Sequence, residues 1–236
     1  MDKIINFKAI SKTLSEIQPK PYPAVKILPD WFRDAKPYIE GENKLTIRNR
    51  ITNYSFKRCT PMLDSMSAGY IISLWADVLV SYEITTGEPN ITWKTHRDVF
   101  NAHGSDTRNV VPPVGYHNQV FKYLNCWIPQ TPKGYSVLIV PPLGHHDLPF
   151  RAIPAIIDSD SSNLEVLFPM WVKSNFEGVV EKGTPLVQII PFKRDNWQAT
   201  FNYYEDGEFE KHDDKNFRGT IVGHYIKNHW SKKNFK

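Results

Sequence analysis

The apolar residues of this chain recur as short runs that alternate with turn signals, and this pattern covers residues 70 to 192. The runs are rich in β-branched and aromatic residues and return about every 8 to 12 residues, which is typical of an all-β sandwich or barrel. No helix-length segment separates them, so we expect antiparallel or mixed pairing. Turns are predicted at Gly87, Gly134 and Gly183. The predicted strands are Tyr70–Leu74, Val78–Ile84, Asn90–Trp93, Val120–Asn125, Tyr135–Val140, Ala155–Ile157, Leu164–Phe168, Gly178–Val180 and Leu186–Phe192.

The N-terminal residues 1–60 lack this pattern and predict an irregular arm with short helices. Apolar residues at helical spacing predict one helix over Lys8–Ile17. The prolines that follow favour an extended path, and Pro29-Asp30 can start a second short helix. Arms of this kind pack on a neighbouring subunit or wrap their own domain.

The C-terminal residues 193–236 are polar and charged, with an acidic middle and a basic end. This composition predicts a solvated extension that carries a short helix near Ile221–Trp230. Residues 61–192 therefore form the predicted β core, between an N-terminal arm and a polar C-terminal extension.

The composition argues against a helical bundle, a disordered chain and a membrane-spanning helix. The 236 residues include 18 prolines and 12 glycines, which argues against a regular helical bundle because proline interrupts long helices. With 41% hydrophobic residues the chain is expected to fold, and it contains no apolar run of about 20 residues that would span a membrane. The first residues lack a continuous apolar stretch, so we expect a soluble, intracellular protein. The net charge of +4 permits an anionic ligand without indicating nucleic-acid binding.

The two cysteines, Cys59 and Cys126, are too few for a disulfide framework or a cysteine-based zinc site. Such sparse cysteine use is typical of a reducing compartment.

Four stretches of the predicted core carry a resemblance to a known family. They are Ser67–Leu74, Thr131–Gly144, Ile156–Val166 and Val180–Ile190. The third contains Ile-Asp-Ser-Asp before an apolar run, and the fourth contains a Lys-Gly turn followed by a glutamine between apolar residues. In this order they resemble the dUTPase and dCTP-deaminase superfamily over about residues 65–192, with an enlarged connection at residues 85–130. The resemblance implies a β-clip, or distorted barrel, core and a homotrimer with sites between subunits.

The resemblance also implies candidate site residues. The superfamily uses the first aspartate of the third stretch to orient the attacking water as a general base, and this position is Asp158 here, with Asp160 close by. Gly144 and Gln188 match ligand-binding positions of the second and fourth stretches. Arg151 is a candidate to replace the family's phosphate-binding arginine, or to pair with one of the aspartates. If the two carboxyls lie close together and buried, one is expected to have a raised pKa.

The chain departs from the superfamily pattern where the chemistry is done. Ile71 stands in place of the aspartate that helps to hold Mg²⁺, and Pro142 and Leu143 stand in place of a phosphate-binding arginine and serine. Ser161 stands in place of the tyrosine that stacks on the deoxyribose. A transition state that gains charge on phosphoryl oxygens needs those cations and donors. The departures therefore favour a protein that has kept the fold without the reaction.

His145 and Asp147 are candidate ligands of a metal ion. Their His-x-Asp spacing is that of one arm of a non-haem iron facial triad, as in 2-oxoglutarate-dependent oxygenases. His212, His224 or His229 would have to supply the third ligand. The competing interpretation is a polar loop in which Asp147 caps a turn.

Three functional hypotheses follow. The stretch Gly183–Arg194, which reads Gly-Thr-Pro-x-x-Gln-x-Ile-Pro-Phe-Lys-Arg, also makes the whole chain resemble a group of tailed-phage proteins. The first hypothesis is therefore a non-catalytic, dUTPase-like phage protein that acts in assembly or in binding a phage or host protein. Its expected location is the host cytoplasm or the virion. The second is a nucleotide-binding or nucleotide-hydrolysing relative that uses Asp158 as base and requires Mg²⁺. The third is an iron-dependent oxygenase that uses His145 and Asp147.

Overall fold

The computed structural model describes residues 3–39, 45–47, 50–52, 55–102, 110–213 and 224–236. It is mostly β, with 33% strand and 17% helix in several antiparallel sheets, and no closed barrel is identified among these residues. The contacts divide the chain into two compact units. Unit 1 comprises residues 1–35, 65–194 and 235–236, and unit 2 comprises residues 36–64 and 195–234. The all-β prediction is confirmed at this level.

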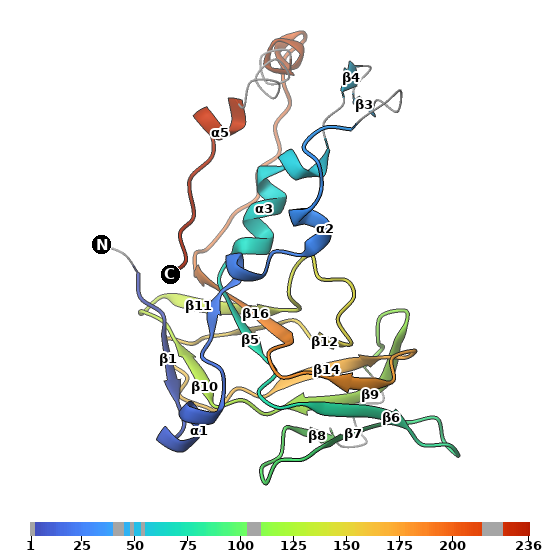
Figure 1. The fold of residues 1–236 in the computed structure, drawn as a ribbon. Helices are drawn as coiled ribbons and strands as arrows, with labels where there is room; N and C mark the ends of the chain where they lie inside the picture. The colour runs from blue at the N-terminus through green and yellow to red at the C-terminus, as the bar shows by residue number, and fades with distance from the viewer. Residues whose placement is uncertain (1–2, 40–44, 48–49, 53–54, 103–109, 214–223) are drawn as a thin grey trace. The chain divides into compact units, whose positions relative to one another are not determined.

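The largest sheet of unit 1 contains five strands in the order β13-β11-β16-β5-β2. Figure 1 labels β11, β16 and β5 of this sheet. Its central strand β16 is buried over Leu186, Val187, Gln188 and Ile189. Because consecutive strand residues point to opposite faces, this run shows that both faces of the sheet are covered at that point. The bounds are β13 Ala155–Ile157, β11 Tyr135–Val140, β16 Pro185–Lys193, β5 Tyr70–Ser73 and β2 Tyr22–Pro23.

Two further sheets and one strand pair complete the β structure of unit 1. The inner residues of all three sheets join in one hydrophobic core, in which Phe100 stacks on Phe150 at 5.0 Å between ring centroids. The four-stranded sheet contains β12 Phe150–Ala152, β14 Phe168–Lys173, β9 Tyr116–Tyr123 and β8 Phe100–Ala102; the three-stranded sheet contains β15 Gly178–Val180, β6 Val78–Tyr82 and β7 Pro89–Trp93; the pair is β1 Asn6–Ala9 with β10 Trp127–Gln130.

The described N-terminal residues 3–35 belong to unit 1 and pair with its strands at two places. β1 pairs with β10 and β2 pairs with β5, so two segments of the predicted arm are strands. Helix α1 (Lys12–Ile17) is shorter than the predicted Lys8–Ile17, because the Ser11 hydroxyl accepts a hydrogen bond from the Leu14 amide and caps the helix there. The short helices η1 (Ala24–Ile27) and α2 (Asp30–Arg33) follow, and α2 begins where Pro29-Asp30 predicted it.

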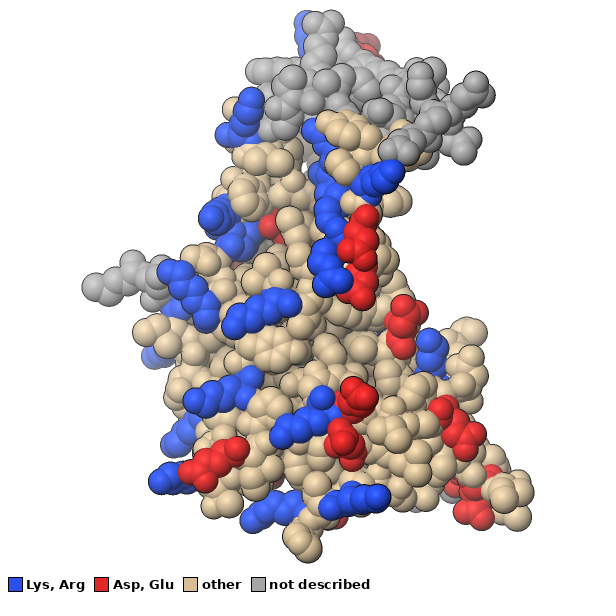
Figure 2. Space-filling view, viewed as in Figure 1, with Lys and Arg blue, Asp and Glu red and all other residues tan. Residues whose placement is uncertain are grey.

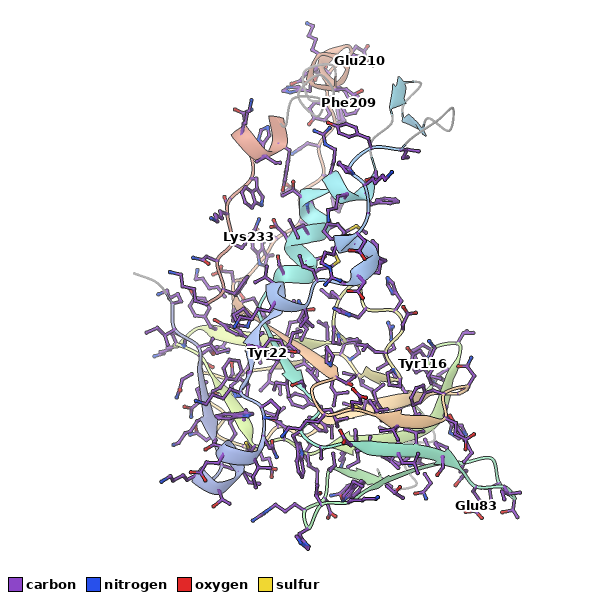
Figure 3. The ribbon with its side chains drawn as sticks, in the orientation of Figure 1. Tyr22, Glu83, Tyr116, Phe209, Glu210 and Lys233 are labelled. Carbon is purple, nitrogen blue, oxygen red and sulfur yellow. The ribbon has the colours of Figure 1, made fainter. Side chains whose placement is uncertain are left out.

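Unit 2 brings residues 36–64 together with the C-terminal segment. It contains the pair β3 (Leu45–Ile47) and β4 (Arg50–Thr52), helix η2 (Phe56–Arg58), helical residues 208–213 and helix α5 (His224–Asn228). Asp64 ties the two parts to each other, since its carboxylate accepts hydrogen bonds from Trp230 at 2.8 Å and from Lys233 at 2.7 Å. Lys233 is labelled in Figure 3. Helix α3 (Thr60–Ser67) begins in unit 2 and ends in unit 1.

Most predicted strands are present, and one is misplaced. The strand predicted over Leu164–Phe168 is wrong: β14 begins only at Phe168, and residues 164–167 form no strand. The Val166 carbonyl is taken by the buried Asn125 side chain instead of a neighbouring strand. The predicted helix near Ile221–Trp230 is present as α5, although residues 221–223 lie outside the described part. The two units are divided after residues 35, 64, 194 and 234, whereas the sequence predicted boundaries after residues 60 and 192. No helix among the described residues has the length and apolarity to cross a bilayer.

Candidate functional site

The two aspartates of the third stretch lie at one end of the five-stranded sheet. Pairing of Val137 with Ile157 brings the segment after β13 beside the start of β11. Pairing of Tyr135 with Lys193 brings Arg194, directly after β16, to the same place, where its amide donates to the Gly134 carbonyl at 2.9 Å. Three segments distant in sequence therefore meet, and we call Ser136, Asp158, Asp160 and Arg194 the acid cluster.

Arg194 binds both aspartates in this cluster. Its Nη1 donates to Asp160 Oδ1 at 2.9 Å and to Asp158 Oδ1 at 3.1 Å, while its Nη2 donates to Asp160 Oδ2. The Gly134 amide donates to Asp160 Oδ2 at 2.7 Å, and the Ser136 hydroxyl donates to Asp158 Oδ1 at 2.6 Å. The Asp160 side chain is 5% exposed and that of Asp158 is 63% exposed. Asp160 is thus enclosed by donors, and Asp158 stands at the surface beside it.

These donors set the protonation state of Asp160. The hydrogen bonds from Arg194, and then that from the Gly134 amide, lower the pKa of Asp160 from 3.8 to about 2. The raised pKa was expected for two buried carboxyls, and this condition is not met, because Asp158 is exposed and Arg194 binds both carboxylates. Asp160 is fully ionised near neutral pH and holds its proton too weakly to act as an effective general base there.

Gln188 makes three hydrogen bonds that join separate parts of unit 1. Its side chain, 1% exposed, accepts from the Leu143 amide at 2.8 Å and donates to the Ser65 carbonyl at 3.1 Å and the Ala68 carbonyl at 2.6 Å. All of these partners are backbone groups of the protein itself. The side-chain amide of Gln188 therefore links β16 by hydrogen bonds to the segment after β11 and to the end of α3.

Gly144 is enclosed by side chains. Its φ is +82°, and a Cβ at this position would lie 2.6 Å from Met66 Sδ and 3.2 Å from Pro29 Cγ. Its carbonyl accepts a hydrogen bond from Trp31 Nε1 at 2.7 Å. The loop that resembles a phosphate-binding segment is packed against the N-terminal residues of its own unit.

The described residues do not fit the Mg²⁺ of a nucleotide hydrolase. Ile71, at the position of the metal-holding aspartate, is 1% exposed and lies opposite Gln188 in the β5–β16 pair. Asp160, an alternative carboxylate, is bound to Arg194. Oxygen ligands are what Mg²⁺ requires, and this position offers an apolar side chain.

The described residues do not fit an iron triad at His145 and Asp147 either. His145 Nε2 hydrogen-bonds the Ile27 carbonyl at 2.7 Å, and burial lowers the pKa of this imidazole. The next residue, His146, stacks on Trp31 with 6.2 Å between ring centroids. Within the described part of the chain, no group of three or more His, Cys, Asp or Glu side chains could hold a metal ion. The side chain of His224 lies outside the described residues.

Arg151 lies apart from the acid cluster. It is an exposed residue of β12, and its guanidinium stands 5.9 Å from the ring centroid of Tyr116 on β9, which Figure 3 labels. The predicted ion pair with Asp158 or Asp160 is made by Arg194 instead.

Arg194 and Ser136 are the cluster residues that sequence reasoning missed. The pairing register could have found them, because the antiparallel pairings of β11 with β13 and with β16 place residues 136, 158 and 194 at one sheet end. The two basic residues that follow the last predicted strand, Lys193 and Arg194, were the available signal.

Known proteins give no further assignment. No family model, no curated protein and no solved structure matches this chain. Its function is therefore argued from the placement of its own side chains.

Proposed function

We propose that this chain is a diverged relative of the dUTPase and dCTP-deaminase superfamily, with a β-clip core, that serves a tailed phage in assembly or partner binding as a homotrimer and catalyses no nucleotide reaction. The observation that carries the proposal is the binding of both candidate catalytic aspartates by Arg194.

The chemistry of the acid cluster supports a structural role. A general base needs a free lone pair and a pKa close to the working pH. Asp160 accepts from Arg194 and Gly134 through both oxygens, and its pKa is about 2. Asp158 is more exposed, and its Oδ1 is shared between Ser136 and Arg194. Its exposure is what favours the alternative, a nucleotide hydrolase with Asp158 as base.

Exposed aromatic side chains in unit 2 support partner binding. Trp197 is 88% exposed, Phe201 92% and Tyr203 87%, all within a segment that has no helix or strand. Aromatic residues of this kind are enriched at protein interfaces and costly to leave in water. We interpret residues 197–204 as the contact segment for a phage or host protein.

Surface charge supports a protein partner over a nucleic acid. On the face drawn in Figure 2, Lys and Arg side chains are dispersed among acidic and uncharged ones. A nucleic-acid site would be expected to gather basic residues along a stripe or groove.

The proposal is tested by two measurements on the full chain. Thermal melting with a panel of deoxynucleoside triphosphates and Mg²⁺ should show no shift, and particles from infected cells should contain the protein. A Trp197→Ser/Phe201→Ser variant should no longer be incorporated into particles, although its melting temperature should be unchanged. The control Ile84→Ser changes a 101% exposed residue of unit 1 and should be incorporated like the wild type. A nucleotide-induced rise in melting temperature together with absence from particles would overturn the proposal.

A further inference from the structure

A second place in unit 1, separate from the acid cluster, has the features of a binding pocket. It has a volume of about 340 Å³ and lies among α1, the Trp75 region, the loop after β7 and the segment after β9. This is the size of small-ligand sites, which begin at about 300 Å³. Its lining includes apolar Ile10, Leu14 and Trp75 and polar Gln18, Arg97 and Glu165.

Gln18 supplies to this pocket a polar donor that is unpartnered among the described residues. Its side chain is 7% exposed, and its Oε1 accepts from the Cys126 amide at 2.8 Å. The Cys126 N–H needs an oxygen acceptor, so this bond assigns the Oε1 and Nε2 positions of the Gln18 side chain. The Nε2 group is left without a hydrogen-bond partner among the described residues. By contrast, the neighbouring lining residue Asn125 uses both its oxygen and its nitrogen within the protein.

Charged groups of both signs surround the opening. Arg97, Asp98 and Glu165 are exposed lining residues, and none of them forms an ion pair with another described residue. Arg97 comes from the loop after β7 and Glu165 from the segment before β14. A ligand with a carboxylate and a nearby nitrogen donor would meet complementary groups on both sides.

Part of the lining is apolar. Leu14 is 8% exposed and Trp75 is 4% exposed, and Trp75 Nε1 is already bonded to the Leu124 carbonyl at 3.0 Å. Trp75 therefore offers its ring, and no hydrogen-bond donor, to the pocket. Walls of this kind suit an aliphatic or aromatic side chain.

We propose that this pocket binds an α-carboxylate that carries an apolar side chain, either as a free amino acid or as the C-terminal residue of a peptide. The carboxylate is received by Arg97 and by Gln18 Nε2. The side chain lies against Leu14 and Trp75, and the ligand nitrogen faces Asp98 or Glu165. The proposal is independent of the function proposed above.

Calorimetry on the full chain with three probes tests it. Leucine carries the carboxylate and an ammonium group, N-acetyl-leucine mimics a chain end, and leucinamide lacks the carboxylate. Binding of leucine or N-acetyl-leucine with at least tenfold weaker binding of leucinamide is expected, and the better of the two identifies the source as free amino acid or chain end. If no probe bound at millimolar concentration, or if leucinamide bound equally well, the proposal would be overturned.

Variants assign the site. Gln18→Glu keeps the acceptor for the Cys126 amide and replaces the donor by a carboxylate oxygen, so binding should weaken about tenfold or more. Arg97→Gln should have a similar effect. Lys94→Gln removes the same charge from an exposed residue of the same loop outside the lining, and should change affinity less than about twofold. Equal affinities for Arg97→Gln and Lys94→Gln would contradict the placement.

Discussion

Replacing Gln188 by leucine removes three part-buried hydrogen bonds while it keeps a side chain of similar volume. The bonds join Gln188 to the backbone at Leu143, Ser65 and Ala68. Leucine can fill the space of a residue that is 1% exposed, so no sizeable cavity forms. The loss therefore falls on three backbone groups, each of which loses its hydrogen bond to Gln188.

The size of the effect follows from their number. A buried donor or acceptor left unsatisfied costs about 1–3 kcal/mol, so three groups with partial access to water give a loss of about 3–5 kcal/mol in the free energy of unfolding. For a unit of this size, each kcal/mol lowers the melting temperature by about 2–4 °C, so we expect a fall of roughly 10 °C. This is a large part of the stability of a typical domain, about 5–15 kcal/mol.

Urea denaturation of the full chain, followed by tryptophan fluorescence, measures this loss. Gln130→Leu is the matched control, because Gln130 bonds Asn6 and Asn163 at exposed positions and should cost less than about 1 kcal/mol. Gln188→Glu keeps one acceptor but faces two carbonyl groups, so it should be destabilising at neutral pH and partly recover in acid, where a protonated carboxyl can donate. If Gln188→Leu were as stable as Gln130→Leu, the conclusion that the hydrogen bonds of Gln188 stabilise unit 1 would be refuted.

Two further predictions concern the acid cluster and a close backbone contact. Because the pKa of Asp160 in the folded chain, about 2, lies below its ordinary 3.8, its ionisation stabilises the fold above about pH 4 and this contribution is lost as the pH falls toward 2. The stability difference between wild type and Asp160→Asn in urea titrations should therefore shrink over that range, and a constant difference would contradict the ion pair with Arg194. In Gly69→Ala the new Cβ would stand 2.0 Å from the Ile189 carbonyl oxygen, whereas Gly87→Ala, with a similar φ of +68° against +71°, meets nothing within 4 Å. Gly69→Ala should cost about 2–3 kcal/mol more than Gly87→Ala in the same assay, and equal costs would refute the close approach.

The strand content of unit 1 was predictable where local pattern and turn chemistry agree. Tyr135–Val140 and Ala155–Ile157 are strands over the predicted residues, and both follow from β-branched runs. β1 and β12 were not predicted, because each is held in the sheet by partners far along the chain. The strand at Leu164–Phe168 was misplaced because a side chain, Asn125, took the backbone group that pairing would have used.

The sequence predicted the two aspartates of the candidate site, but it did not predict their ion pair with Arg194 or the protonation state of Asp160. The sequence placed Asp158 and Asp160 together, but only the antiparallel register brings Arg194 to them. The protonation state of Asp160 depends on that arginine and on the Gly134 amide, which are distant in sequence. The pairing of elements, which local patterns do not specify, decided whether these carboxylates are free.

Product formation from deoxynucleoside triphosphates is the measurement that bears most directly on whether the acid cluster performs chemistry. Wild type and Asp158→Asn would each be incubated with dUTP, dCTP, dATP, dGTP and dTTP and Mg²⁺, and the products separated by chromatography. We expect neither protein to form mono- or diphosphates, or deaminated bases, above a protein-free control. Turnover by the wild type that disappears in Asp158→Asn would contradict a purely structural role for this cluster.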